Sequence, residues 1–189
     1  LQIDGNKATY TASYNYGIDL SSSSNNTVTG NTCNNNNFGI NLSSSSNNTV
    51  TGNTCNNNSN YGIYLDSSSN NTVTGNTCNN NSTYGIDLSS SSSNNTVTGN
   101  TCNNNSNSGI YLSSSSSYNT VTGNTCNNNN FGIYQYSSSD NTVTGNTCNN
   151  NSNYGICLLS SSNNTITGNT CIRGTGQSSD YTSSQYTIH

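Results

Sequence analysis

Seven cysteines recur at one position of a repeated unit, and stacked thiols are the residues in this chain best suited to chemistry at a fixed spacing. The unit, Asn-Thr-Val-Thr-Gly-Asn-Thr-Cys, returns every 22–24 residues, with Ile in place of Val in its last copy. The cysteines of this column are Cys33, Cys55, Cys78, Cys102, Cys126, Cys148 and Cys171. Stacked thiols can form disulfides, bind a soft metal ion or serve as small buried apolar side chains.

Two of these three outcomes remain in competition. Neighbouring column cysteines would approach the Cα separation of a disulfide, about 4.4–6.8 Å, if the units stack. The pairs would be Cys33 with Cys55, Cys78 with Cys102 and Cys126 with Cys148. We favour a buried column of free thiols, because Cys behaves as a small hydrophobe. A zinc site is disfavoured, since each unit supplies one column thiol and the only histidine, His189, is terminal. We therefore expect no metal and no other cofactor.

A second regular array consists of threonines. Every unit carries Thr-x-Thr, which on a strand places the two hydroxyls on one face about 6.7 Å apart. Such a flat, uncharged array resembles the ice-binding faces of antifreeze solenoids, whereas Thr also suits any exposed sheet. The pairs are Thr27 and Thr29, Thr49 and Thr51, Thr72 and Thr74, Thr96 and Thr98, Thr120 and Thr122, Thr142 and Thr144, and Thr165 and Thr167.

Aromatic residues form two further columns. Six of them precede the glycine of a Gly-Ile-X-Leu step, where Ser108 is the exception, and three tyrosines occupy the X position. We interpret the first column as cover for a thin core, and the second as an interrupted strip on which a glycan could bind. The residues are Tyr16, Phe38, Tyr61, Tyr84, Phe131 and Tyr154 in the first column, and Tyr64, Tyr111 and Tyr134 in the second.

The acidic residues argue against catalysis. Asp19 and Asp87 share a repeat position three units apart, about 14 Å on stacked coils, which exceeds the carboxylate separations of glycosidases. Asp66 and Asp140 are assigned to loops. No Ser-His-Asp set can be assembled, because His189 is the last residue. The sequence therefore predicts a protein that is not an enzyme.

Alternating residues indicate the elements that position these columns. Ile and Leu of Gly-Ile-X-Leu share one face of a strand, and Val of Thr-Val-Thr and the column Cys can face the same interior. The Gly-Asn pairs, such as Gly30-Asn31, break the strands at corners, because both residues tolerate unusual backbone angles. Asn-rich and Ser-rich stretches of variable length form the remaining bends. The variation in repeat length from 22 to 24 residues is expected in these bends.

Strands wound in one direction predict an all-β parallel β-helix of about seven coils. A leucine-rich horseshoe shares the period but needs tandem leucines and a helical half that are missing here. The unit, with its Asn-Thr-x-x-Gly-Asn motif, resembles the β-helix repeats of NosD-like periplasmic proteins and of Asn/Ser/Thr-rich secreted surface proteins of methanogenic archaea. The resemblance covers about residues 14–171. It implies a right-handed helix and an extracellular or cell-surface location.

Both ends of the chain depart from the repeat. We expect residues 1–13 to be an N-terminal end or cap, residues 14–171 to be the β-helix, and residues 172–189 to cap the last coil or donate a strand to a neighbouring subunit. The expected function is a non-enzymatic, self-assembling subunit of a surface layer, sheath or filament, with ice binding or glycan binding as alternatives. The expected assembly contacts are Ile172, Tyr181, Tyr186 and Ile188.

Charge limits the remaining partners. Two Lys and Arg residues stand against six acidic residues, so the chain lacks the basic footprint of nucleic acid binding. No apolar stretch approaches the roughly 20 residues that span a bilayer. N-glycans are expected at Asn-x-Ser/Thr acceptors, which are Asn25, Asn47, Asn57, Asn70, Asn80, Asn94, Asn104, Asn150 and Asn163.

Overall fold

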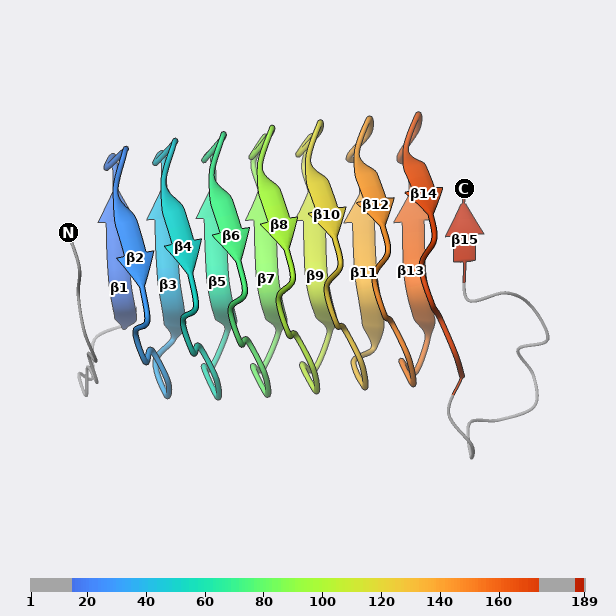
Figure 1. The fold of residues 1–189 in the computed structure, drawn as a ribbon, viewed down its shortest axis with the longest axis horizontal. Coiled ribbons are helices and arrows are strands. Elements are labelled where there is room, and N and C mark those ends of the chain that lie inside the picture. Colours follow the sequence, from blue (N-terminus) through green and yellow to red (C-terminus); the bar gives the residue numbers. More distant parts are fainter. Residues whose placement is uncertain (1–14, 174–185, 189) are drawn as a thin grey trace.

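The computed structural model describes residues 15–173 and 186–188, and the expected N-terminal end segment 1–13 lies outside them. The described chain winds into stacked coils that together form a parallel β-helix (Figure 1). Each complete coil contributes one strand of six residues and one of three. No described segment is a helix, so none could cross a membrane as one. The predicted all-β solenoid of about seven coils is confirmed.

Two parallel sheets form the walls of the helix. The long-strand sheet contains, in spatial order, β1 (Tyr16–Ser21), β3 (Phe38–Ser43), β5 (Tyr61–Asp66), β7 (Tyr84–Ser89), β9 (Ser108–Ser113), β11 (Phe131–Tyr136), β13 (Tyr154–Leu159) and β15 (Tyr186–Ile188). The short-strand sheet contains β2 (Thr27–Thr29), β4 (Thr49–Thr51), β6 (Thr72–Thr74), β8 (Thr96–Thr98), β10 (Thr120–Thr122), β12 (Thr142–Thr144) and β14 (Thr165–Thr167). Equivalent repeat positions pair in register throughout, for example Ile63 with Ile86.

The interior is a thin apolar core made of the four predicted columns. Ile, Leu, Val and Cys of successive coils stack, and in the middle coils they are fully buried, as are Ile86, Leu88, Val97 and Cys102. One exception interrupts the Leu column at Gln135, which is completely buried between Leu112 and Leu158 on the neighbouring strands. Neither polar atom of its side chain has a hydrogen-bond partner. The core therefore carries one uncompensated amide.

Buried asparagines form three ladders at the bends. In one of them the Asn100 carbonyl oxygen accepts the backbone N–H of Asn76 at 2.9 Å, while the Asn100 amide donates to the Val73 carbonyl at 2.9 Å and to the Asn124 side chain at 3.0 Å. The pattern repeats from coil to coil. Because buried amides cost free energy unless they are paired, these ladders hold the bends in register.

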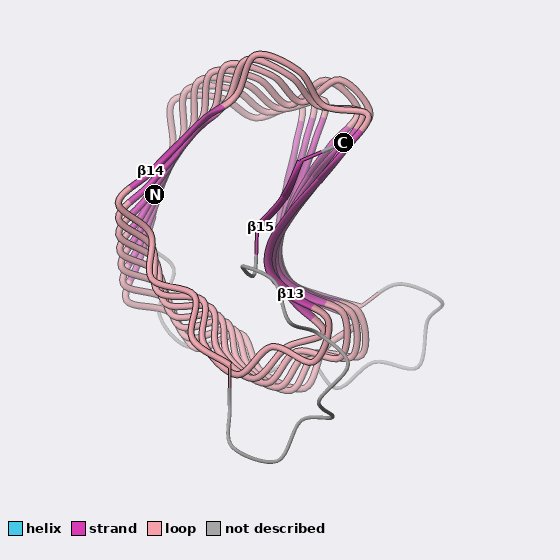
Figure 2. Cartoon of the chain, turned by 90° about the vertical axis from the view of Figure 1, so that its right-hand side faces the viewer, coloured by secondary structure: helices cyan, strands magenta, loops and turns pink. Residues whose placement is uncertain are grey.

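Glycine before the Ile position brings the strand close to the cysteine column. A Cβ at Gly62 would lie 2.6 Å from the carbonyl oxygen of Gly85 and 2.8 Å from Cβ of Cys78. No other residue fits at this close approach. Gly and Ile both face inward here, and the long strands bend toward the interior, so the backbone of this sheet is concave on its outer side (Figure 2).

The C-terminal tail returns to the helix. β15 pairs in parallel with β13 and aligns Tyr186 with Ile156 and Ile188 with Leu158. Residues 186–188 thus add an eighth strand to the sheet of their own chain. That residues 172–189 cap the last coil or donate a strand to a neighbouring subunit stays a prediction. Ile172 is 59% exposed beyond the last coil, and Tyr181 lies outside the described residues.

Candidate functional site

Aromatic side chains form one continuous row on the outer face of the long-strand sheet. Ring centroids of successive members lie 4.6–5.9 Å apart, the range of favourable aromatic pairs. Tyr111 fills the gap that Ser108 leaves in the first column, since it contacts Tyr84 at 4.6 Å and Tyr134 at 5.2 Å. We call this set the aromatic row: Tyr16, Phe38, Tyr61, Tyr64, Tyr84, Tyr111, Phe131, Tyr134 and Tyr154.

Asp87 lies in the middle of the aromatic row. Its strand neighbours at the same position are Tyr64 on β5 and Tyr111 on β9. The side chain is 2% exposed, and the Ser89 hydroxyl donates a hydrogen bond to Oδ1 at 2.6 Å. Burial raises the pKa of this carboxyl to about 7, with a further rise from the charge of Asp66. The carboxyl can therefore exchange a proton near neutral pH, as a general acid or base must.

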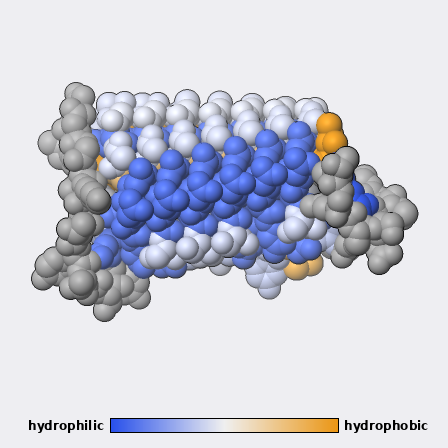
Figure 3. Space-filling view, turned by 90° about the horizontal axis from the view of Figure 1, so that it is seen from below, coloured by the Kyte–Doolittle hydropathy of each residue, from blue (hydrophilic) through white to orange (hydrophobic). Residues whose placement is uncertain are grey.

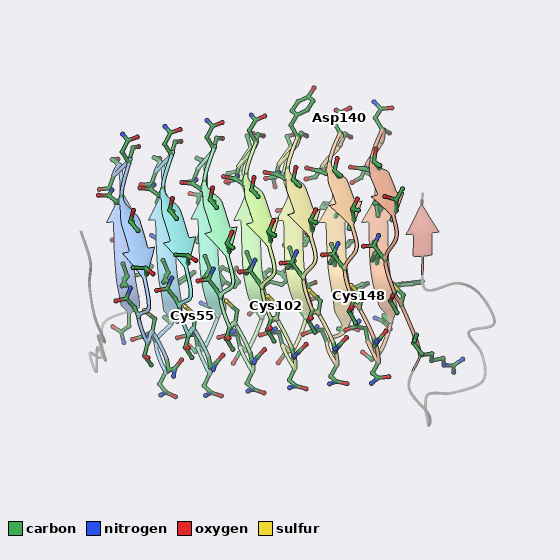
Figure 4. All side chains as sticks on the ribbon, viewed as in Figure 1. Cys55, Cys102, Asp140 and Cys148 are labelled. Carbon is green, nitrogen blue, oxygen red and sulfur yellow. The ribbon has the colours of Figure 1, made fainter. Side chains whose placement is uncertain are left out.

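Asp66 does not lie in a loop, which corrects the expectation from the sequence. It is the last residue of β5 and pairs with Ser89, the hydrogen-bond donor to Asp87. The two aspartates lie on adjacent strands with an offset of two residues, which corresponds to about 8 Å between their Cα atoms at ordinary strand spacing. They occupy different repeat positions, so the repeat spacing alone does not pair them. Asp140 does lie at a bend, beyond the end of β11 (Figure 4).

The tyrosines around Asp87 remain protonated at neutral pH. Burial raises the pKa of Tyr64 and Tyr84 above the ordinary value, and the negative charge of Asp87 contributes in both cases. Tyr61 and Tyr111 shift in the same direction, mainly because of burial. Each phenol can then donate a hydrogen bond to a ligand or a reacting oxygen.

Asp19 lies on the same outer face but in the first described coil. Its carboxylate accepts hydrogen bonds from the Asn41 amide at 2.7 Å and from the Ser21 hydroxyl at 3.0 Å. Two strands, β3 and β5, lie between it and the strand of Asp87, which agrees with the predicted separation of three coils. Asp19 therefore belongs to the same surface without sharing a site with Asp87.

The threonine array occupies the outer face of the short-strand sheet. Its side chains are exposed or half-buried, whereas the central Val of each strand is buried up to the sixth copy and Ile166 of β14 is partly buried. Equivalent threonines pair in register from β2 to β14, as the spacing predicts. Thr144 and Thr167 share a hydroxyl hydrogen bond of 3.2 Å. The array is regular and uncharged, and no titratable group lies within it.

The cysteine column consists of free thiols inside the helix, where Cys55, Cys102 and Cys148 follow the helix axis (Figure 4). Six of its members are fully buried, whereas Cys171 in the last coil is half-buried. Burial raises the pKa of Cys78 and Cys126 well above the ordinary range. No group of three or more metal-ligating side chains gathers within the described chain. Cys157 instead faces the outer side at the X position and is 7% exposed.

The surface between the sheets is polar and follows the repeat, with hydrophilic side chains aligned in rows along the axis (Figure 3). All nine expected glycan acceptors are exposed corner residues with positive φ, as Asn57 with φ 56° and Asn94 with φ 58° illustrate. Asn35 has the same corner conformation, with φ 60°, but is followed two residues later by Asn37 instead of Ser or Thr. The chain thus contains acceptor corners and a matched corner without an acceptor motif.

Comparison with known proteins gives one family match and several similar solved structures. The model of the right-handed beta helix region matches residues 1–126 and 112–189. A mutant of the periplasmic alginate epimerase AlgG is 27% identical, with a TM-score of 0.72 over 76% of this chain and 34% of that chain. The A-module of the mannuronan C-5 epimerase AlgE6 of Azotobacter vinelandii is 17% identical, with a TM-score of 0.73 over 77% of this chain and 41% of that one. Pectate lyase Pel9A is 16% identical, with a TM-score of 0.58 over 78% and 50%.

No curated protein matches this chain, which spans between a third and a half of the length of these solved structures. The similar structures are enzymes that act on polysaccharides, and they contradict the prediction of a non-enzymatic structural subunit, its ice-binding alternative and the prediction that the chain is not an enzyme. The physical reason for the error lies in Asp66, Asp87 and Tyr111. Asp66 departs from the Ser common at its position, the X position of Asp87 and Tyr111 varies from coil to coil, and only the stacking of coils brings these residues together.

The match of the family model extends over the whole chain. It also agrees with the in-register coils, the buried Ile, Leu, Val and Cys columns and the two parallel sheets. This protein belongs to the right-handed β-helix family.

Proposed function

We propose that this protein processes a polysaccharide on the outer face of the long-strand sheet, with Asp87 as the group that transfers the proton. The observation that carries the proposal is a nearly buried carboxyl with a pKa of about 7 in the centre of a continuous aromatic row. Perturbed carboxyls of this kind are concentrated at functional sites. The similarity to polysaccharide epimerases and lyases supports the same assignment.

The aromatic row suits an extended ligand. It continues across all seven long strands from β1 to β13, so a polymer chain lying along the helix axis would cross the coils one after another. Aromatic side chains give a large apolar contact area, and the tyrosine hydroxyls add hydrogen-bond donors. A polymer bound in this way would pass over Asp87 near the middle of its contact.

We place this activity outside the cytoplasm. AlgG, to which this chain is similar, is described as periplasmic, and this supports the placement. A cell-surface location, like self-association of the chain, stays a prediction.

The test is a comparison of the wild-type protein with Asp87→Asn on a panel of polysaccharides. Three readouts cover the chemistry of similar enzymes: new reducing ends, ultraviolet absorbance of unsaturated products, and proton NMR of inverted sugar centres. We expect wild type to alter at least one polymer and Asp87→Asn to lose about 100-fold or more of that activity, the usual contribution of a general acid or base.

The matched control is Asp140→Asn. Asp140 lies at a bend with φ 57°, and Asn occupies the equivalent corner in other coils, for instance Asn94 with φ 58°. This variant removes the same charge from the molecule without touching the aromatic row, so its activity should equal that of wild type. Equal activity of Asp87→Asn and wild type would refute the assignment of Asp87.

A further inference from the structure

The charge of the candidate site differs from what a uronate polymer requires. Three aspartates, Asp19, Asp66 and Asp87, belong to the outer face of the long-strand sheet. Within residues 15–173 and 186–188 the one Lys or Arg is Arg173, which follows the last coil. Alginate and mannuronan carry a carboxylate on every sugar, and like charges at contact distance are unfavourable. The face therefore disfavours a polyanion.

Uncharged sugars fit the same face better. The tyrosines of the aromatic row keep their protons at neutral pH, because burial raises the pKa of Tyr64 and Tyr84. They can donate hydrogen bonds to sugar hydroxyls, and they introduce no charge. Neutral sugar rings also present apolar C–H faces that pack on aromatic side chains. A neutral polymer therefore offers the hydroxyl groups and apolar ring faces that the tyrosines of the aromatic row can bind.

We infer that the substrate is an uncharged polysaccharide and that the chain cleaves it by hydrolysis. This inference rests on the function proposed above and names the substrate and the reaction of that same site. Two carboxyls carry it: Asp87, whose pKa lies near neutrality, and Asp66 on the neighbouring strand, half-buried and diagonal to it. Hydrolysis by two carboxyls needs one protonated partner and one ionised partner, with room for a water molecule between them in the inverting case.

The reaction balances with water as the only co-reactant. Asp87 donates its proton to the glycosidic oxygen as the bond from that oxygen to the anomeric carbon breaks. Asp66 takes a proton from a water molecule, whose oxygen forms the new bond to the anomeric carbon. The products are a free hydroxyl and a new reducing end, and the proton on Asp66 returns through solvent to Asp87. Asp87 is 2% exposed and lies between Tyr64 and Tyr111 on the neighbouring strands, so side chains around it must move before the sugar reaches it.

The spacing of the two aspartates suits this reaction. Their Cα atoms are about 8 Å apart at ordinary strand geometry. The register places both side chains on one face of neighbouring strands. Direct attack by water, as written above, inverts the anomeric centre.

The experiment measures binding and products with two polymer sets. Neutral mannan, xylan and glucan are compared with alginate and polygalacturonate by affinity electrophoresis, at low and high salt, with and without Ca²⁺. We expect the neutral polymers to bind at least about tenfold more tightly than the uronates at low salt, with the difference shrinking as salt screens the charges. Neutral polymers should yield new reducing ends without ultraviolet absorbance, and NMR should show inversion.

Variants separate the inference from the function on which it rests. Asp66→Asn should lose hydrolysis of the neutral polymer while binding it unchanged, and Asp140→Asn should retain both. Binding or conversion of uronates alone, with or without Ca²⁺, would overturn the neutral-substrate inference and leave the polysaccharide function intact. Wild-type hydrolysis that Asp66→Asn does not reduce would overturn the two-carboxylate reaction. No change in any polymer, neutral or anionic, would refute the proposed function itself.

Discussion

Replacing Asp87 with asparagine should stabilise the protein at neutral pH and remove one part of its pH dependence. Asparagine occupies the equivalent position in β3, where Asn41 is buried, so the shape is compatible with the sheet. Asp87 accepts a hydrogen bond from the Ser89 hydroxyl, and within residues 15–173 and 186–188 the one Lys or Arg is Arg173, beyond the last coil. A buried carboxylate without a counter-charge costs stability whenever it is ionised.

The magnitude follows from the pKa. An ordinary Asp carboxyl titrates near 3.8, and burial raises that of Asp87 to about 7. Between these two values the folded state holds a proton that the unfolded chain has lost. Asp87 therefore lowers the free energy of unfolding progressively as pH rises from about 4 to about 7, and the loss is constant above that range. At 1.36 kcal/mol per pH unit the total is roughly 4 kcal/mol.

The assay is urea unfolding followed by circular dichroism, for wild type, Asp87→Asn and Asp140→Asn between pH 4 and pH 8. The stability difference between Asp87→Asn and wild type should grow by roughly 4 kcal/mol across this range in favour of the variant. Asp140→Asn is the control for loss of one negative charge elsewhere on the molecule. If the curves of wild type and Asp87→Asn run parallel from pH 4 to pH 8, the carboxyl does not titrate near 7, and its role as a neutral-pH proton donor is refuted.

Three further outcomes follow from the structure. Gln135→Leu should raise the free energy of unfolding by about 1–3 kcal/mol, because it removes two unpaired buried polar atoms and restores the Leu column; no gain in urea unfolding would contradict this. In native protein a thiol reagent should modify Cys171 first and the buried column only after unfolding, as mass spectrometry would detect, and rapid labelling of Cys102 would count against the buried column. In a host that performs N-glycosylation, Asn57 should gain a glycan and Asn35 should not, whereas Asn37→Ser should add one at Asn35; intact masses would settle both.

The strands, the corners and the inward-facing residues of each coil could be predicted from the sequence. Alternation fixed which side of each strand faces inward, so Ile63, Leu65, Val73 and Cys78 all lie in the core where the pattern placed them. The Gly-Asn corners also follow, since Gly75 has φ 63° and Asn76 enters a buried ladder. Each of these features is local to one unit and repeats in the next, so periodicity reports it directly.

The candidate site could not be predicted in the same way, because it depends on residues that depart from the repeat. Asp66 occupies a position where four other coils have Ser, and its diagonal relation to Asp87 exists only when β5 lies beside β7. The two aromatic columns each look interrupted in the sequence. They merge into one row because Tyr111 leans toward Tyr84 and Tyr134, a side-chain contact that no spacing rule specifies.

Most positions of this chain repeat from coil to coil and only a few differ, which explains why the sequence predicted a structural protein. In-register ladders such as Asn76, Asn100 and Asn124 stabilise every coil equally, so any single position on the outer faces can vary without loss of the fold. Asp87 occupies one of these variable positions and lowers the free energy of unfolding by roughly 4 kcal/mol at neutral pH. A carboxyl that costs this much where asparagine would fit, as Asn41 does two coils away, is better explained by the proton it can deliver than by the stability of the helix.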